Sequence, residues 1–248
     1  MSAPSAAAPA GAPGAIAGVP SEASDIRAIP SVPESAISET LAARLPRAMP
    51  APWATSGCGL VWLYRAPAGA ASHHQRGLVF ERSVPLGIAA FLRYEQGPVG
   101  SYDELIAMPT VLIRKRRLSL AVPFIAVDSE ASIAGGRSNW ALPKTLAEFD
   151  WEQRDGLPQR ISARGEGWSA AARTVWLGPR LPLWARARQT QVRADGSLAV
   201  VPVRSRGVGR IARVEVQSSG PTLPAWLTSG VHFGVAIERV THRILAAS

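Results

Sequence analysis

The sequence predicts a mainly β (α+β) fold: a single-domain, closed or nearly closed antiparallel β-barrel with a few short peripheral helices. Strand-like runs rich in β-branched and aromatic residues follow one another from Trp53 to the C-terminus, and Gly or Pro separates them, whereas helical patterns are few. Closing the sheet also removes the exposed edges that a large open sheet would have. The 248 residues are enough for one domain with its own core.

The N-terminal residues 1–48 are predicted to be a disordered tail, because Ala, Pro, Ser and Gly dominate them and Pro recurs every few positions. Within this tail a short helix is expected over 38–45, capped by Ser38 and stopped by Pro46. Residues 49–248 then form the barrel domain.

Turn residues bound the strands expected in the barrel. These strands cover 59–65, 111–127 with breaks at 114–117 and Pro123, 159–164, 208–217 and 233–245. The clearest hairpin spans 191–205, where Asp195 and Gly196 predict a type I′ turn. Short helices are expected over 84–90 and 141–148.

The net charge of +9 would suit a nucleic-acid partner, and Arg114–Arg117 is the densest basic cluster. Most of the excess lies at alternating strand positions, which is typical of solvated strand faces, so no nucleic-acid partner is expected. The single cysteine, Cys58, and the absence of a basic start and apolar run in residues 1–20 favour a cytoplasmic protein. No stretch approaches the roughly 18 consecutive apolar residues of a membrane span, so no membrane partner is expected.

Only two of the 27 basic residues are lysines, Lys115 and Lys144. Arginine stays protonated, whereas a buried lysine can lose its proton and attack a carbonyl group. Lys115 lies among arginines and is interpreted as a surface charge. Lys144 follows Trp140, Leu142 and Pro143, and such apolar surroundings favour the neutral, nucleophilic amine. The structural alternative is a surface lysine at the start of a short helix.

Two blocks of sequence resemble the acetoacetate decarboxylase family. In the first, DSEASIAGGRSNWALPKTLAEF over 128–149, Gly136 and Arg137 are followed by Pro143 and Lys144 with the family's spacing. Lys144 therefore falls on the family's Schiff-base lysine. The family archetype carries a second lysine after the reactive one, and this chain has Thr145 there, which leaves burial to favour the neutral amine.

The second block, FLRYEQGPVGSYDELIAMP over 91–109, resembles the family's Arg-aromatic-Glu segment and the glutamate that follows it. The matching positions are Arg93, Tyr94, Glu95 and Glu104, in the family's order relative to the lysine. The resemblance implies a cone-like barrel, and it implies a homo-oligomer because members of the family commonly self-assemble.

The resemblance also implies a mechanism and a role for each matched residue. Lys144 condenses with the ketone of a β-keto acid, and the protonated imine takes up the electrons of the breaking C–C bond. Arg93 or Arg137 holds the substrate carboxylate, while Glu95 and Glu104 orient the lysine or relay protons. Because the imine is itself the electron sink, no organic cofactor is expected. No metal is expected either, since the sequence has no Cys/His ligand cluster.

Each of these residues also has a structural alternative. Arg93 and Glu95 share a strand face and could be a solvated pair, and Glu104 could cap a loop or helix. Arg137 could form a salt bridge with Asp128 or Glu130. Trp140 is expected to contact the substrate as part of the pocket wall, or else to belong to the core.

The function expected from these residues is decarboxylation of a small β-keto acid such as acetoacetate. An aldolase or dehydratase using the same imine on a larger keto acid is the enzymatic alternative. A non-catalytic barrel that binds a small acid, with Lys144 as a counter-ion, is the alternative that Thr145 keeps open.

Overall fold

The computed structural model describes residues 26–248. Its strands are β1 (Trp53–Arg65), β2 (Arg82–Val84), β3 (Leu86–Gln96), β4 (Tyr102–Met108), β5 (Val111–Arg114), β6 (Arg117–Ser119), β7 (Phe124–Val127), β8 (Lys144–Leu146), β9 (Glu148–Arg154), β10 (Leu157–Gly165), β11 (Trp168–Val192), β12 (Leu198–Ser219) and β13 (Gly230–Ile244). The helices are α2 (Glu39–Arg44) and α3 (Glu130–Trp140), with short 3-10 turns at Pro33–Ser35, Ala70–His73 and Leu223–Ala225.

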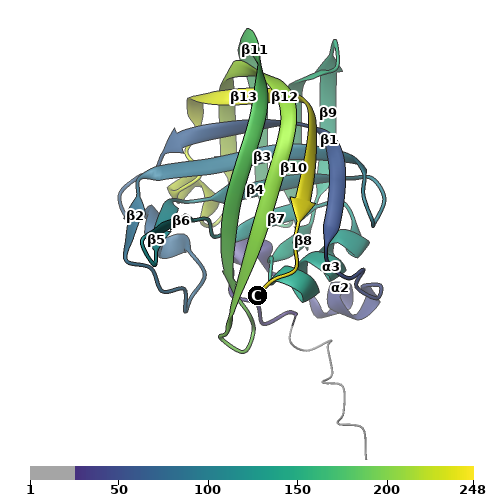
Figure 1. Cartoon of the computed structure of the whole chain (residues 1–248), viewed down its shortest axis with the longest axis vertical. Coiled ribbons are helices and arrows are strands. Elements are labelled where there is room, and N and C mark those ends of the chain that lie inside the picture. The colour runs from purple at the N-terminus through teal and green to yellow at the C-terminus, as the bar shows by residue number, and fades with distance from the viewer. Residues whose placement is uncertain (1–25) are drawn as a thin grey trace, which may run out of the picture.

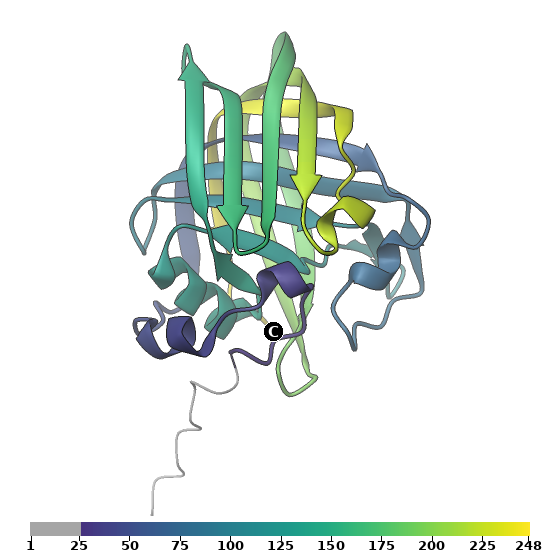
Figure 2. The ribbon, with the colours of Figure 1, turned by 180° about the vertical axis from the view of Figure 1, so that it is seen from behind.

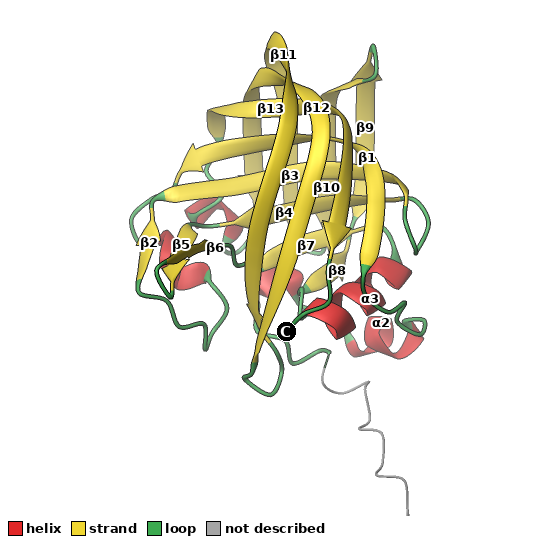
Figure 3. Cartoon of the chain, viewed as in Figure 1, coloured by secondary structure: helices red, strands yellow, loops and turns green. Residues whose placement is uncertain are grey.

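One curled sheet of ten strands dominates the molecule (Figures 1 and 3). The strand order is β8-β7-β4-β3-β1-β13-β12-β11-β10-β9, and every neighbouring pair is antiparallel except β7 and β8. The two edge strands, β8 and β9, are consecutive in the chain and separated only by Ala147, so the sheet curls until its edges meet at one point. From behind, the green strands β9–β11 cross the blue strands of the opposite wall (Figure 2). The predicted fold class, a nearly closed β-barrel with few helices, is confirmed.

Two hydrophobic cores lie on opposite faces of the β1-β3-β4-β7 part of the sheet. The core inside the curl contains Trp62, Phe91 and Leu105, all fully buried. The core on the other face contains Ile125 and Trp140 and lies between the sheet and α3. Because side chains alternate along a strand, each position of β3 and β4 belongs to one of these faces and not to the other.

The prediction of a disordered tail is wrong for residues 26–48; residues 1–25 lie outside the described part. Residues 26–48 pack against the barrel, because the buried carboxylate of Glu34 accepts hydrogen bonds from the backbone of Thr222 and Leu223 and from the Thr222 hydroxyl. The short helix predicted after Ser38 is confirmed as α2, and the Ser38 hydroxyl accepts a hydrogen bond from the Leu41 amide. Frequent proline excludes regular structure but does not exclude a fixed path against a surface.

The predicted strands over 59–65, 111–127, 159–164, 208–217 and 233–245 correspond to β1, β5–β7, β10, β12 and β13. The two helices predicted over 84–90 and 141–148 are wrong, because these residues pair as β3 and β8 while the helix comes earlier, as α3. The 191–205 hairpin is confirmed, but its turn is not type I′. Only Gly196 has a positive φ there, 83°, whereas type I′ requires a positive φ at two residues.

Among the helices of residues 26–248, none is long and apolar enough to cross a membrane.

Candidate active site

Lys144 is the first residue of β8 and follows the turn that leads out of α3. Helix α3 ends in Ala141, which adopts the left-handed conformation with φ 53° and donates its amide to the carbonyl groups of Gly136 and Arg137. The Lys144 side chain then runs back along the helix and is only 3% exposed. A Cβ atom on Gly136 would lie 2.6 Å from Lys144 Cδ, so this glycine makes room for the lysine chain.

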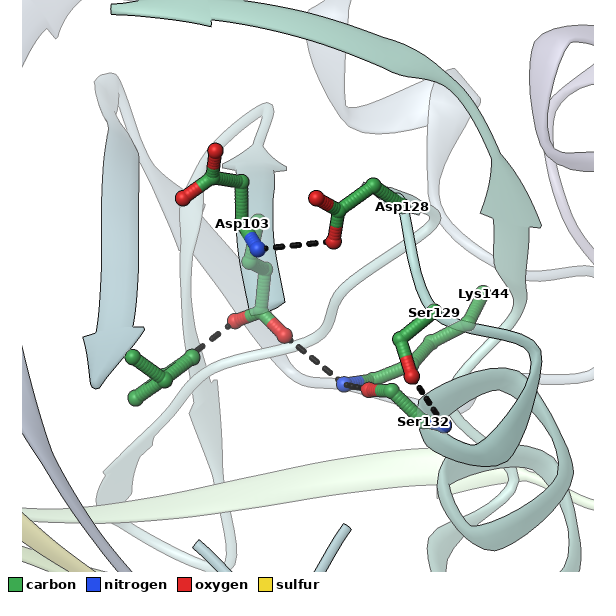
Figure 4. Close-up of polar contacts among 7 residues, drawn as sticks. Asp103, Asp128, Ser129, Ser132 and Lys144 are labelled. Atoms are coloured by element: carbon green, nitrogen blue, oxygen red, sulfur yellow. Dashed lines mark hydrogen bonds and ion pairs between the residues drawn. The ribbon is translucent and has the colours of Figure 1, made fainter. Parts of the chain in front are cut away.

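The Lys144 amine lies in a small polar cluster within the core. Nζ donates to Glu104 Oε2 at 2.7 Å and to Ser132 Oγ at 2.9 Å (Figure 4). It also lies 5.1 Å from the centre of the Tyr102 ring, close enough for a cation–π contact. The cluster is therefore a buried ion pair with one hydroxyl and one aromatic face around the amine.

Glu104 belongs to β4 and is buried. Its second carboxylate oxygen, Oε1, accepts a hydrogen bond of 3.4 Å from the Tyr94 hydroxyl. Burial raises the pKa of Tyr94 and that of Tyr102 well above their usual range, and the negative charge of Glu104 adds to both shifts. Both phenols therefore stay protonated at neutral pH and act as neutral neighbours of the carboxylate.

The N-terminal end of α3 places Ser132 beside the amine. Ser129 caps the helix, and its hydroxyl accepts a hydrogen bond from the Ser132 amide at 3.2 Å (Figure 4). Asp128, just before the cap, accepts from the Asp103 amide at 2.8 Å and so ties the start of the helix to β4. Burial raises the pKa of Asp128. These contacts fix the helix relative to the strand that carries Glu104.

Arg93 and Glu95 lie on the opposite face of the sheet from Lys144. Arg93 forms a two-pronged ion pair with Asp103, at 2.8 Å for both bonds, and its guanidinium stacks over Trp151 at 4.6 Å. Glu95 is exposed, and its charge helps burial to raise the pKa of Cys58 on that same face. Tyr94, between them in sequence, is the residue of this motif that turns toward the lysine.

The Arg137 guanidinium is buried and bonds only to backbone carbonyl groups of the described residues. Nε donates to the Lys144 carbonyl at 2.7 Å, Nη1 to Ile26 at 2.6 Å and Nη2 to Ser35 at 2.7 Å. Burial lowers its pKa to about 10. The alternative salt bridge to Asp128 or Glu130 is wrong, since Glu130 pairs with Arg44 instead. Arg137 thus joins the start of β8 to the N-terminal segment.

Trp140 packs in the core at the end of α3. Its ring meets Trp53 edge to face at 4.9 Å, and its indole N–H donates to the Leu245 carbonyl at 2.8 Å. Of the six site residues predicted from the sequence, only Lys144 and Glu104 meet through their side chains, whereas Arg137 reaches Lys144 at its backbone carbonyl.

The sequence analysis missed Ser132, Tyr102 and His242 and gave Tyr94 no role. Strand alternation was the available signal for Tyr102, since it lies two residues before Glu104 on the same strand and therefore on the same face. Ser132 was hidden because the helix was predicted over 141–148, around the lysine, rather than over 130–140. His242 comes from the distant C-terminal strand, and no local pattern links it to the lysine.

The arrangement provides a nucleophile beside a proton acceptor in surroundings with little water. A lysine amine attacks carbonyl groups when it can give up a proton, and Glu104 lies within hydrogen-bonding distance to receive it. Within residues 26–248 no group of three or more His, Cys, Asp or Glu side chains is placed to hold a metal ion.

The protein is thus a curled β-sheet whose candidate site is a buried lysine–glutamate pair beside one short helix. The sequence model described as acetoacetate decarboxylase (ADC) matches residues 75–227, more than half of the chain. The chain therefore belongs to the acetoacetate decarboxylase family. No curated protein sequence matches it.

Solved structures with the same fold include members and relatives of this family. The acetoacetate decarboxylase of Legionella pneumophila is 13% identical, with 82% of this chain and 88% of that chain covered and a TM-score of 0.55. The enduracididine biosynthesis enzyme MppR is 14% identical, with 88% and 92% covered and a TM-score of 0.60. An acetoacetate decarboxylase-like enzyme from Sphingomonas wittichii RW1 is 16% identical, with 81% and 93% covered and a TM-score of 0.59. At these identities the likeness concerns the fold.

Proposed function

We propose that this chain is an enzyme that forms a Schiff base through Lys144 and decarboxylates a small β-keto acid such as acetoacetate. The observation that carries the proposal is the buried Lys144 amine, 2.7 Å from Glu104 and 2.9 Å from the Ser132 hydroxyl. Membership of the acetoacetate decarboxylase family supports the same chemistry. Burial keeps water away from the amine, and water would otherwise compete for the imine.

The proposed reaction uses the Lys144 amine as the nucleophile and the Glu104 carboxylate as the group that moves the proton. Glu104 takes a proton from the Lys144 ammonium, and the neutral Nζ attacks the ketone carbon to give a carbinolamine. Glu104 then returns the proton to the carbinolamine hydroxyl, which leaves as water and yields the protonated imine. The C–C bond to the carboxylate breaks, its electrons flow into the imine, and carbon dioxide leaves. The resulting enamine takes a proton on carbon, and hydrolysis releases the ketone and regenerates the amine.

The position of the two predicted carboxylate-binding arginines bears on this reaction. Arg93 is paired with Asp103 on the other face, and the Arg137 guanidinium is used by three backbone carbonyls. Neither is free to hold a substrate at the amine. A carboxylate bound by neutral donors is stabilised less than one paired with a guanidinium, and this favours the loss of carbon dioxide.

The test exploits the fact that Lys115 is the other lysine of the chain. The protein is incubated with acetoacetate and borohydride, the adduct is located by peptide mass spectrometry, and carbon dioxide release is measured in parallel without borohydride. We expect an adduct on Lys144 that survives in Lys115→Met and disappears in Lys144→Met. The double variant Lys144→Met with Glu104→Gln repeats the test without leaving the carboxylate unpaired.

Three outcomes are informative. An adduct together with carbon dioxide supports the decarboxylase. An adduct without carbon dioxide would replace it by an aldolase or dehydratase that uses the same imine. No adduct across a panel of keto acids, in protein that is folded by circular dichroism, would overturn the Schiff-base proposal and leave a binding protein.

A further inference from the structure

His242 on β13 belongs to none of the sequence motifs, yet it approaches the same cluster from the C-terminal strand. Its ring packs against the Tyr94 ring with the centroids 5.8 Å apart, and Tyr94 in turn reaches Glu104 through its hydroxyl. Only one phenol and one carboxylate therefore separate the imidazole from the Lys144 amine.

One nitrogen of this imidazole is fixed and the other is free. Nδ1 lies 2.7 Å from the hydroxyl of Ser205, its register partner on β12. The two ring nitrogens point in diverging directions, so Nε2 faces away from β12. Nε2 is buried and has no hydrogen-bond partner in residues 26–248. A buried polar atom without a partner costs about 1–3 kcal/mol, so such atoms in native proteins call for an explanation.

Two more buried polar atoms without a partner in the described residues lie on this face of the sheet. They are the hydroxyl of Tyr102, whose ring faces the amine, and the hydroxyl of Thr55, the register partner of His242 on β1. Buried hydrogen-bonding groups therefore lie both beside the amine, at Tyr102 near Ser132, and beside His242, at Thr55. Such groups fit a ligand that brings oxygen atoms of its own.

We propose that His242 is a substrate-positioning residue: its Nε2 hydrogen-bonds the carboxylate of a keto acid whose ketone carbon lies at Lys144, and Ser205 holds the ring for this purpose. With Ser205 donating to Nδ1, the proton lies on Nε2 and makes it the donor. This inference rests on the proposed function. It assigns to His242 the carboxylate-binding role that was predicted for Arg93 or Arg137, which are both engaged elsewhere.

The state of the imidazole agrees with this role. Burial lowers the pKa of His242, and the negative charge of Glu104 opposes this shift. The charged and titratable groups that face the ring from neighbouring elements are Glu104 on β4 and Tyr94 on β3. The ring is therefore neutral at pH 7 and serves as a hydrogen-bond donor rather than as a cation.

Trapping with two ligands separates positioning from chemistry. Acetoacetate carries the carboxylate, and acetone offers the same ketone without it; both are reduced onto Lys144 with borohydride. For His242→Phe we expect the acetoacetate concentration for half-maximal trapping to rise about 10- to 100-fold, the effect of losing a hydrogen bond to a charged group, with acetone trapping unchanged. His242→Gln should retain most of the affinity, because its amide N–H can occupy the place of Nε2.

The matched control is His232→Phe on the same strand, whose ring bonds to the Thr228 carbonyl and packs near Tyr64. It should leave both ligands unaffected. An unchanged half-maximal concentration of acetoacetate in His242→Phe would overturn the proposal. Failure of the wild type to form an adduct with either ligand would instead remove the proposed function.

A second measurement needs neither turnover nor a variant. In wild-type protein with 15N-labelled histidine, 3-hydroxybutyrate supplies the carboxylate but cannot form an imine. We expect its addition to shift the Nε2 resonance of His242 and not that of His232. An unshifted His242 signal at saturating ligand would refute carboxylate binding whatever the chemistry at Lys144.

Discussion

Replacing Gly136 by alanine should disable the amine while leaving the fold intact. The added Cβ would lie 2.6 Å from Lys144 Cδ and 2.8 Å from Cε, where ordinary contact begins at 3.4 Å. The lysine chain must therefore move by about 0.8 Å, and a misplacement of this size in an active site costs up to about 100-fold in rate. The displaced atoms belong to a flexible side chain, and alanine favours a helix by about 1 kcal/mol over glycine, so the melting temperature should change little.

The assay compares the rate of borohydride trapping of acetoacetate with the unfolding midpoint for each variant. Gly135→Ala is the control on the same helix, because its Cβ would meet the Trp53 ring at 2.3 Å and not the lysine. This control should lose stability but keep the trapping rate per folded molecule. Gly136→Ala that traps as fast as wild type would refute the view that the lysine needs this space.

Three further predictions concern the segments that hold the site. Arg137→Met leaves three carbonyl groups, two of them buried, without this donor, and urea titration should show about 3 kcal/mol of lost stability; an unchanged midpoint would contradict the bridging role. Glu34→Ala releases residues 222–223 from the N-terminal segment, so limited proteolysis should cut near residue 30 faster than in wild type, and equal rates would argue against this tether. His74 bonds to Thr110, and burial lowers its pKa to about 4 from the ordinary 6.5. The unfolded chain binds this proton first, so stability should be full above pH 6.5 and fall by about 3 kcal/mol toward pH 4, a slope that His74→Gln should remove.

The strands could be predicted from the sequence because each one carries a local signal. Alternating apolar residues and Gly or Pro boundaries mark β1, β10 and β13 without reference to the rest of the chain. The helix could not be placed in this way. Residues 130–140 contain two glycines and no apolar stripe, since α3 is buried on most sides and leaves space for the lysine at Gly136. Its helical state follows from the Ser129 cap and from tertiary packing.

The site could be predicted only where a family motif and strand alternation agree. Lys144 and Glu104 satisfy both. Arg93 and Glu95 were chosen for their charge, but the alternation along β3 turns both away from the lysine and turns Tyr94 toward it. His242 and Ser205 enter through the register of β12 and β13, a pairing between segments far apart in the chain that no local pattern specifies.

The strand geometry also accounts for the residue that departs from the family archetype. Thr145 follows Lys144 directly on β8, so its side chain points to the other side of the strand. There the hydroxyl donates to the Ala36 carbonyl at 3.1 Å and lines a groove of about 550 Å³ beside the N-terminal segment. Position 145 therefore secures the N-terminal segment rather than adding charge at the amine. In the described residues Nζ is surrounded by Glu104, Ser132 and the Tyr102 ring, so the reactivity that we propose for it depends on burial and on proton transfer to the carboxylate.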